Sequence, residues 1–399
     1  MNRYNKSYLL ILLLLIYGPF VVLLASCKSS DDPKPIEKPG GDDDGDEDSP
    51  AGDFNYVYKE ETGGYQVYRI PALVKTVGGK LLAFAEARKL KSNGDSGDID
   101  LVVKVSDDNG KTWGNSITIW DDGPNTCGNP VPIVDQETGR IHLLMSWNDG
   151  EDTWGAISDG KGKAGRKVFY TWSDDEGTSW QTPKEITSDV KDATWNWYGT
   201  GPVHGIQISK GNHKGRLVSP NYFNVNINGQ RKDYAHVIYS DDHGQTWKPG
   251  AATPSDNVGE CTVAELSDGR LMLNMRPSVG NARIYSISED GGETWEAMQT
   301  DYTLVDANCQ GSMCSGTIGG QYGLFFANAA SAERKNMTVK RSKNDGTSWT
   351  QQLQIHEGPS GYSDMTITED NQLALLYESG VGRPYEGIAL KLMALDDLK

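Results

Sequence analysis

An eight-residue motif occurs five times in this chain, and its spacing constrains the fold more than any other feature. The copies read SDDNGKTW, SDDEGTSW, SDDHGQTW, SEDGGETW and SKNDGTSW, and they begin at residues 106, 173, 240, 288 and 342. Their mean spacing is about 59 residues. Strand-like stretches such as DIDLVVKVS and RKVFYTWS precede the copies. Repeats of this length that carry strand patterns predict the blades of a β-propeller.

We therefore expect an all-β fold, a six-bladed β-propeller with four-stranded antiparallel blades. Residues 54–399 have room for about six repeats of this length. Five blades carry a motif, and the segments before the first copy and after the last complete the sixth blade from both ends of the chain. The 46 Gly, 18 Tyr and 11 Trp fit short strands and tight turns better than helices.

Each copy follows one strand pattern and precedes another, so the motif is predicted to form a hairpin turn. Its Asp can accept hydrogen bonds from backbone amides, its Gly accepts a positive φ, and its Trp packs against the blade. Only the last copy departs, with Asn344 in place of Asp. A catalytic or calcium-binding role would have to explain five equivalent copies, so we interpret the motif as scaffold.

The first 53 residues predict a sorting signal and a tether. Residues 1–27 combine a basic start, an apolar run and the sequence LASC, which resembles the lipobox of bacterial lipoproteins and implies lipidation of Cys27. An uncleaved membrane anchor is the alternative. Residues 28–53 are acidic and rich in Pro and Gly, so a disordered tether is expected. The mature protein would be exported and lipid-anchored to the bacterial outer membrane, on its periplasmic or cell-surface side.

Charge and cysteine content exclude several classes of function. The net charge of −17 offers no basic face for nucleic acid, and an anionic substrate would need a local cluster of Arg. The domain carries Cys127, Cys261, Cys309 and Cys314. Cys309 and Cys314 are close enough in sequence for a disulfide, although four Cys allow three pairings. No CxxC pair or His-rich cluster has metal-ligand spacing, so we do not expect a metal site.

The segment YRIPAL, together with the five motifs, resembles the bacterial exo-sialidase (neuraminidase) family across residues 54–399. In that family the fold is a six-bladed propeller, and the motif is called the Asp box. Its substrate carries a carboxylate, which three arginines bind; Arg suits this task because its planar fork meets a carboxylate bidentately. The resemblance assigns Arg69 in YRIPAL, Arg276 in LMLNMRPS and Arg334 in FFANAASAERKNMTVK. Arg341 lies near Arg334 and remains an alternative.

The same resemblance assigns the nucleophile and its base. A substrate carboxylate disfavours a carboxylate nucleophile, and sialidases use a tyrosine instead. Tyr362 in EGPSGYSDM takes this role. A phenol is almost fully protonated at neutral pH, so it needs an adjacent base. Glu260 is assigned as that base in preference to Glu265, which strand alternation places on the opposite face.

A general acid is expected in the segment ARKLKSNGDSGDID, which contains Asp95, Asp98 and Asp100. Asp95 fits the family's spacing from Arg69 best, whereas Asp100 begins a strand. In the family, an Arg at the position of Arg88 contacts the O4 side of the sugar.

Glu378 in LLYE matches a Glu that holds the first arginine by a salt bridge, so we pair it with Arg69 as a supporting residue. Trp195, Trp197 and Tyr198 are candidates for the sugar pocket or for the core. The mechanism leaves His204 no task, so it is interpreted as structural.

The function predicted from the resemblance is a retaining exo-α-sialidase that acts on sialylated oligosaccharides, glycoproteins and glycolipids. It needs no cofactor, and a monomer is expected. A trans-sialidase or an anhydro-forming transglycosylase would keep the same residues and is one alternative. A non-catalytic sialic-acid-binding propeller is the other, although it would gain nothing from Tyr362, Glu260 and Asp95.

Overall fold

The computed structural model of the chain describes residues 54–91 and 94–398. These residues form an all-β fold, as predicted, with two short helices, α1 (Trp154–Ser158) and α2 (Thr187–Val190). No helix in the described ranges has the length and apolar character needed to cross a membrane. The predicted signal segment with Cys27 and the predicted tether lie outside the described residues.

The strands form four sheets, in which almost all neighbours are antiparallel. The largest has the order β2-β3-β4-β6-β7-β8-β9, with β5 paired to β4. Its strands are β2 (Val67–Lys75), β3 (Leu81–Arg88), β4 (Ile99–Ser106), β5 (Ile117–Trp120), β6 (Thr126–Val134), β7 (Ile141–Asn148), β8 (Lys167–Ser173) and β9 (Lys184–Glu185). Only the single parallel pair Ile99–Thr126 joins β4 to β6.

Two smaller sheets follow along the chain. The first contains β10 (Trp195–Thr200), β11 (Ile206–Gln207), β12 (Leu217–Ile227), β13 (Gln230–Ser240) and β14 (Lys248–Pro249). The second contains β15 (Val258–Glu265), β16 (Leu271–Pro277), β17 (Ala282–Ser288) and β18 (Gln299–Val305).

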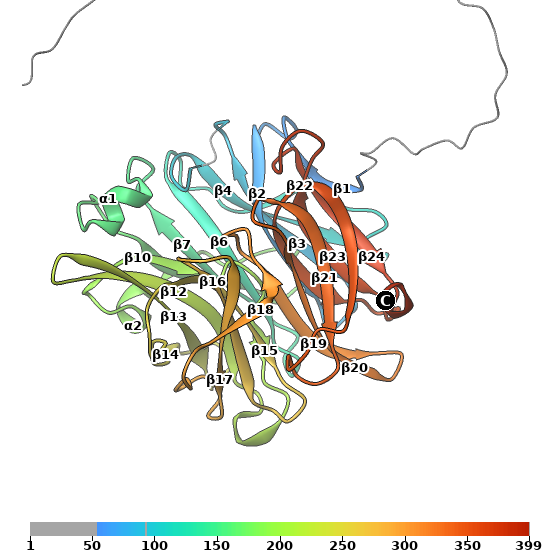
Figure 1. The fold of residues 1–399 in the computed structure, drawn as a ribbon. Coiled ribbons are helices and arrows are strands. Elements are labelled where there is room, and N and C mark those ends of the chain that lie inside the picture. Colours follow the sequence, from blue (N-terminus) through green and yellow to red (C-terminus); the bar gives the residue numbers. More distant parts are fainter. Residues whose placement is uncertain (1–53, 92–93, 399) are drawn as a thin grey trace, which may run out of the picture. The chain divides into compact units, whose positions relative to one another are not determined.

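The last sheet brings the two ends of the described chain together. Its strands are β19 (Ser312–Ile318), β20 (Gln321–Ala329), β21 (Lys335–Ser342), β22 (Gln351–Ile367), β23 (Leu373–Ser379), β24 (Gly387–Met393) and β1 (Tyr56–Lys59). The first half of β22 pairs with β21 and its second half with β23. The blue strand β1 pairs with the red strand β24, which closes the sheet with an N-terminal strand (Figure 1).

The five repeated motifs begin where five strands end. The last residue of β4, β8, β13, β17 and β21 is in each case the motif's first Ser. In the first copy Asp108 accepts hydrogen bonds from the Ser106 hydroxyl at 2.8 Å, the Thr112 amide at 2.8 Å and the Thr112 hydroxyl at 2.6 Å. The bonds from Thr112 and Ser106 hold the pKa of Asp108 at about 2. The other three Asp make the same contacts, so all four carboxylates are used within their own turns.

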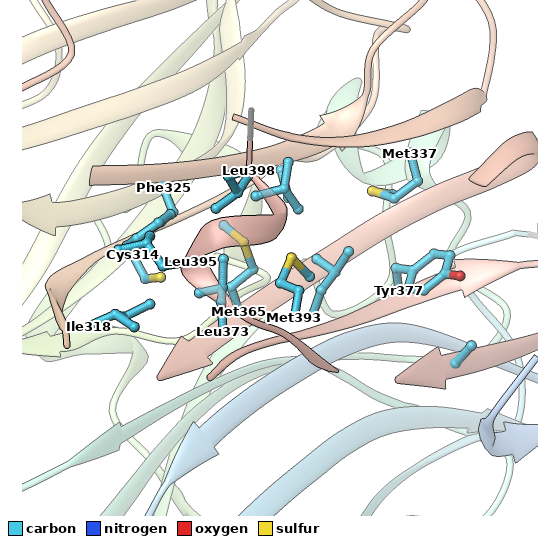
Figure 2. Packing of buried hydrophobic residues seen from close by; sticks show 14 residues of the cluster. Cys314, Ile318, Phe325, Met337, Met365, Leu373, Tyr377, Met393, Leu395 and Leu398 are labelled. Atoms are coloured by element: carbon cyan, nitrogen blue, oxygen red, sulfur yellow. The ribbon is translucent and has the colours of Figure 1, made fainter. Parts of the chain in front are cut away.

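Apolar clusters lie between neighbouring strand layers and hold them in place. Figure 2 shows the one formed by the last sheet, which includes Phe325, Met337, Met365, Leu373 and Leu398. Its members are almost completely buried. Such packing fixes the backbone that carries the polar residues at the strand ends.

Antiparallel pairing gathers the predicted site residues at the ends of the strands away from the motifs. Arg69 lies near the start of β2, and the neighbouring strand β3 runs back toward that end. The next strand, β4, starts at that end and runs away from it to the first motif. Glu260 lies near the start of β15 and Arg276 near the end of β16, so pairing of these strands brings the two residues to the same end.

Candidate active site

A cavity of about 400 Å³ opens at this end of the strands. Six of the residues predicted from the sequence line it: Arg69, Asp95, Glu260, Arg276, Arg334 and Tyr362. Two others, Glu378 and Arg88, are buried behind the lining. Residues from five separate regions of the chain therefore meet at one place.

Tyr362 and Glu260 are in direct contact although 102 positions separate them. The Tyr362 hydroxyl donates a hydrogen bond to Oε1 of Glu260. The two residues are only 6% and 7% exposed. Burial and the charge of Glu260 raise the pKa of Tyr362 well above its usual value, and Arg276 and Arg334 offset part of this rise. The phenol is therefore protonated at neutral pH, and its proton points at a carboxylate that can accept it.

Arg276 supports this pair from the cavity side. Its Nη1 donates to Oε2 of Glu260 at 2.6 Å and to the Tyr362 hydroxyl at 3.5 Å. Its Nε donates to Oδ1 of Asn308 at 2.8 Å. Glu260 thus contacts the phenol with one oxygen and a guanidinium with the other, which fixes the orientation of its carboxylate.

Arg69 and Arg334 both lie against the Tyr362 ring. Their Cζ atoms are 5.1 and 5.4 Å from its centroid. Nε of Arg69 is 3.1 Å from Oε1 of Glu378, and this buried ion pair is the contact that the resemblance implied. Arg341, the alternative to Arg334, instead donates to the Tyr322 carbonyl at 2.6 Å and does not line the cavity.

Irregularities in three strands place these side chains. Arg69, Glu260 and Tyr362 each lie where the pairing register shifts, between Arg69 and Ala72, between Val258 and Cys261, and between Ser360 and Ser363. Such bulges turn a side chain away from regular alternation and are common beside active sites. Regular alternation along these strands does not predict these orientations.

Next to Arg69, the backbone adopts a conformation that is unfavourable for its residue type. Ile70 has a φ of 60°, which is rare for a β-branched side chain. Its amide donates to Oε1 of Glu378 at 3.0 Å, and the Tyr362 amide donates to Oε2 at 3.0 Å. One buried carboxylate therefore holds the Arg69 side chain and two strand backbones, and it stabilises the strained turn at Ile70.

Asp95 is the only one of the three candidate acids that lines the cavity among the described residues. Its side chain is 47% exposed, and its Oδ1 lies 3.6 Å from Nη2 of Arg88. Asp98 instead pairs with Lys89 at 2.9 Å. Asp100 is buried at the start of β4 and accepts a hydrogen bond from Tyr65 at 2.7 Å. The geometry therefore favours Asp95 as the acid.

Arg88 does not reach the cavity lining. Its Nη2 donates to Glu86 at 2.5 Å and its Nη1 to the Gly94 carbonyl at 2.7 Å. These contacts direct the guanidinium toward the loop that carries Asp95. In this arrangement Arg88 holds the loop, and Asp95 lies between it and the cavity.

The aromatic candidates divide between the cavity and the core. Trp197 lines the cavity, with the Arg166 guanidinium 3.9 Å from its ring centroid. Trp195 instead stacks on Phe223 at 3.6 Å, and Tyr198 is fully buried.

Two further predictions concerned His204 and the cysteines. His204 is held by Asp364, with Nδ1 2.6 Å from Oδ1, and does not line the cavity. All four cysteines of residues 54–91 and 94–398 are buried and free, so the Cys309–Cys314 disulfide considered above is absent from this part of the chain. The reason is that the two side chains pack in different places, Cys309 against Tyr362 and Cys314 in the cluster of Figure 2.

Sequence reasoning missed ten residues that line the same cavity. They are Trp154, Tyr222, Phe223, Asn224, Arg231, Asp233, Gly259, Ser278, Asn308 and Tyr385. Asn308 and Tyr385 lie in loops, where no periodic pattern marks the direction of a side chain. The one signal for Tyr385 in the sequence is its position seven residues after Glu378, a predicted site residue.

Comparisons with known proteins identify the family. Residues 79–375 match the model of a BNR repeat-like domain. The chain is 32% identical over 342 residues to an exo-alpha-sialidase of Arthroderma benhamiae, a match that covers 79% of each chain. The chain belongs to the sialidase family. Its relatives include a sialidase of Bacteroides fragilis, 31% identical over 346 residues, and a sialidase of Micromonospora viridifaciens, 32% identical over 344 residues.

The family match does not extend over the full length of these two bacterial sialidases. It covers 81% and 82% of this chain but only 62% and 52% of the respective relative. Among solved structures, a Hadza microbial sialidase is 30% identical, with a TM-score of 0.77 over 86% of this chain and 69% of that one. An intramolecular trans-sialidase from Ruminococcus gnavus has a TM-score of 0.74 at 18% identity, covering 88% of this chain and 99% of its own, which shows a shared fold.

Proposed function

We propose that the protein is a retaining exo-α-sialidase that releases terminal sialic acid from glycoconjugates by means of a tyrosine nucleophile. The contact between the Tyr362 hydroxyl and Glu260, inside a cavity with three arginines, is the observation that carries this proposal. A phenol that is buried and protonated is useful as a nucleophile only if a base removes its proton as it attacks. Glu260 is positioned to do so.

In the first step Arg69, Arg276 and Arg334 bind the substrate carboxylate. The Tyr362 oxygen bonds to the anomeric carbon while its proton passes to Glu260. The bond from that carbon to the glycosidic oxygen breaks, and Asp95 gives its proton to this oxygen.

In the second step a water molecule attacks the anomeric carbon. Asp95 accepts a proton from this water, the bond to Tyr362 breaks, and the tyrosine recovers its proton from Glu260. Two inversions at one carbon retain the configuration.

We propose further that the catalytic domain, residues 54–399, is a six-bladed propeller with Asp-box hairpin turns. The pairing supports this count. The eight-stranded sheet divides at its single parallel pair, and the last sheet divides within β22, so that both yield two four-stranded units. Together with the two smaller sheets they make six units, and β1 completes the last one beside β24.

For localisation we propose export and a lipid anchor at Cys27 in the bacterial outer membrane, with a monomeric catalytic domain. Replacement Cys27→Ala is expected to move the protein from the membrane fraction to the soluble fraction. Retention of this variant in the membrane would favour an uncleaved anchor.

The catalytic proposal is tested with the full chain and sialyllactose. Wild type should release sialic acid, first as the α-anomer by NMR, and Tyr362→Phe and Asp95→Ala should each lose nearly all of this activity. Tyr285→Phe is the matched control, because its hydroxyl bonds only to Gln299 on the outer strands among the described residues. An anhydro or transfer product would indicate the transglycosylase. Binding without turnover, unchanged in Tyr362→Phe, would indicate the non-catalytic alternative.

A further inference from the structure

Tyr385 lies between two of the three arginines of the cavity. Cζ of Arg69 is 4.3 Å from the centroid of its ring. Its hydroxyl accepts a hydrogen bond from Nη1 of Arg334 at 2.7 Å. A single side chain therefore contacts both cations, one with its π face and the other with its oxygen.

This arrangement reduces an electrostatic cost. Two guanidinium groups that face one cavity repel each other, and burial strengthens that repulsion. The face of an aromatic ring attracts a cation, and a phenol oxygen accepts a hydrogen bond from one. The centroid of the Tyr362 ring is 5.1 Å from the same Cζ atom, so two tyrosine rings lie close to this arginine. Tyr385 thus helps to keep Arg69 and Arg334 in place before any anion arrives.

The loop that carries Tyr385 is itself held in shape. It connects β23 to β24, and the Glu386 carboxylate accepts hydrogen bonds from three of its amides, those of Val381 at 3.0 Å, Gly382 at 2.8 Å and Arg383 at 3.1 Å. Burial raises the pKa of Glu386, but these three bonds and the charge of Arg383 together lower it by more. A loop fixed in this way loses little further entropy when a ligand binds.

We propose that Tyr385 is a positioning residue for the carboxylate clamp and that its hydroxyl donates its own proton to the bound carboxylate. This inference rests on the proposed function, since it assigns a further partner to the same substrate group. A tyrosine hydroxyl can accept and donate at the same time. Its oxygen already accepts from Arg334, so its proton is left to donate, and the anion that Arg334 and Arg69 bind is the matching acceptor.

Two variants of the full chain separate the parts of this role. Tyr385→Phe keeps the ring beneath Arg69 and removes the hydroxyl, whereas Tyr385→Leu removes both. The probes are the 2,3-didehydro analogue of sialic acid and its methyl ester, which lacks the negative charge and carries one additional methyl group. Calorimetry gives the dissociation constants, and sialyllactose turnover gives KM and kcat.

For Tyr385→Phe we expect about tenfold weaker binding of the acid, the effect of one hydrogen bond to a charged group. The dissociation constant of the methyl ester from Tyr385→Phe should be within twofold of its value for wild type. For Tyr385→Leu we expect a further loss of about fivefold for the acid, because Arg69 loses its contact with the ring. In both variants, KM for sialyllactose should rise in parallel with the dissociation constant of the acid, and kcat should change by a smaller factor than KM.

Equal losses for the acid and the ester would indicate general damage to the cavity and would overturn the inference. Acid binding by Tyr385→Phe equal to wild type would overturn it while leaving the proposed function intact. A folded wild type that binds neither probe and cleaves no sialoside would overturn both. Tyr285→Phe serves as the control, and because Tyr385→Phe removes one oxygen atom only, the test does not depend on the stability of the leucine variant.

Discussion

The carboxylate of Glu378 binds the guanidinium of Arg69 through two hydrogen bonds, Nε to Oε1 at 3.1 Å and Nη2 to Oε2 at 3.3 Å. Arg69 is 4% exposed and Glu378 is fully buried. Because the same two oxygens accept the amides of Ile70 and Tyr362, this pair ties the first arginine of the clamp to the strand that carries the nucleophile.

Replacement Glu378→Gln should therefore destabilise the whole domain. Removal of one partner of a buried ion pair leaves an uncompensated charge and typically costs about 3–5 kcal/mol. Urea unfolding measures this loss of free energy. The control is Glu369→Gln, since Glu369 pairs with Lys75 at 3.0 Å on the surface, where such a pair contributes at most about 1 kcal/mol. Equal stability of the two variants would contradict this account.

The pair of His204 and Asp364 predicts a dependence of stability on pH. Burial lowers the pKa of His204, but the neighbouring Asp364 raises it by more, so the net shift is upward from the ordinary value of about 6.5. Because the pKa of His204 is raised in the folded state, its protonation stabilises the folded protein. This contribution to the unfolding free energy is fully present below pH 6.5 and is lost as the pH rises through the pKa of the folded state.

We therefore expect the free-energy difference between wild type and His204→Asn to shrink as the pH of a urea titration rises from 6 to 9. The variant keeps a donor near Asp364 but cannot titrate, so subtraction removes the contributions of other groups. A difference that stays constant across this range would show that His204 does not change its charge.

The interpretation of the repeated motif as scaffold predicts that Asp290→Ala affects stability and leaves activity unchanged. Asp290 accepts hydrogen bonds from Ser288, at 2.8 Å, and from the amide and hydroxyl of Thr294, at 2.9 and 2.5 Å. Their loss should cost about 1–3 kcal/mol of unfolding free energy. KM and kcat for sialyllactose should remain within twofold of wild type. A large fall in kcat with normal stability would instead assign chemistry to this turn.

A matched control for that experiment occurs within the chain. In the fifth copy Asn344 stands at the Asp position and accepts from Ser342 at 2.8 Å and from the Ser348 amide at 3.0 Å. An amide can therefore replace the carboxylate in this turn. Asp290→Asn should accordingly lose much less stability than Asp290→Ala.

The sequence predicts those features that local pattern or spacing determines. The motif's first Ser ends a strand in all five copies, because the turn chemistry of Ser, Asp and Gly is encoded within eight residues. Six of the residues assigned by resemblance also line one cavity, as the resemblance implied. Their relation cannot be derived from spacing alone, since Arg69 and Glu378 lie 309 positions apart and meet only because distant strands pair.

Features that depend on irregular backbone were not predictable from the sequence. The register shifts beside Arg69, Glu260 and Tyr362 have no local signal in an apolar strand, yet they direct all three side chains. Tyr385 was missed because its role comes from contacts with Arg69 and Arg334, which belong to other strands. The disulfide considered between Cys309 and Cys314 is absent for a similar reason, since proximity in sequence does not determine against which residues a cysteine packs.

Asn308, another residue that sequence reasoning missed, is expected to orient Arg276. It lies in a turn with a φ of 54°, a conformation that Asn tolerates well. The turn is held by the buried ion pair between Arg283 and Asp306, whose Nη1 and Oδ2 atoms are 3.0 Å apart. Arg283 donates to the backbone carbonyl of Cys309 at 3.0 Å, and Asp306 accepts from the backbone amide of Cys309 at 3.0 Å. In this rigid turn the side-chain Oδ1 of Asn308 accepts a hydrogen bond from Nε of Arg276. The terminal nitrogens of the guanidinium are therefore left to bind Glu260 and the substrate.

Replacement Asn308→Gly should therefore raise KM for sialyllactose by about three- to tenfold, the lower range for a hydrogen bond to a charged group at a partly exposed site. Gly accepts the positive φ, so the turn itself should persist and the unfolding free energy should change little. The change in kcat should be smaller than the change in KM, because Tyr362 and Glu260 keep their mutual contact. Asn371→Gly is the matched control, since Asn371 has a φ of 60° in the turn between β22 and β23, at the opposite end of the strands. If both variants raise KM equally, the effect belongs to the glycine substitution, and the orienting role of Asn308 is wrong.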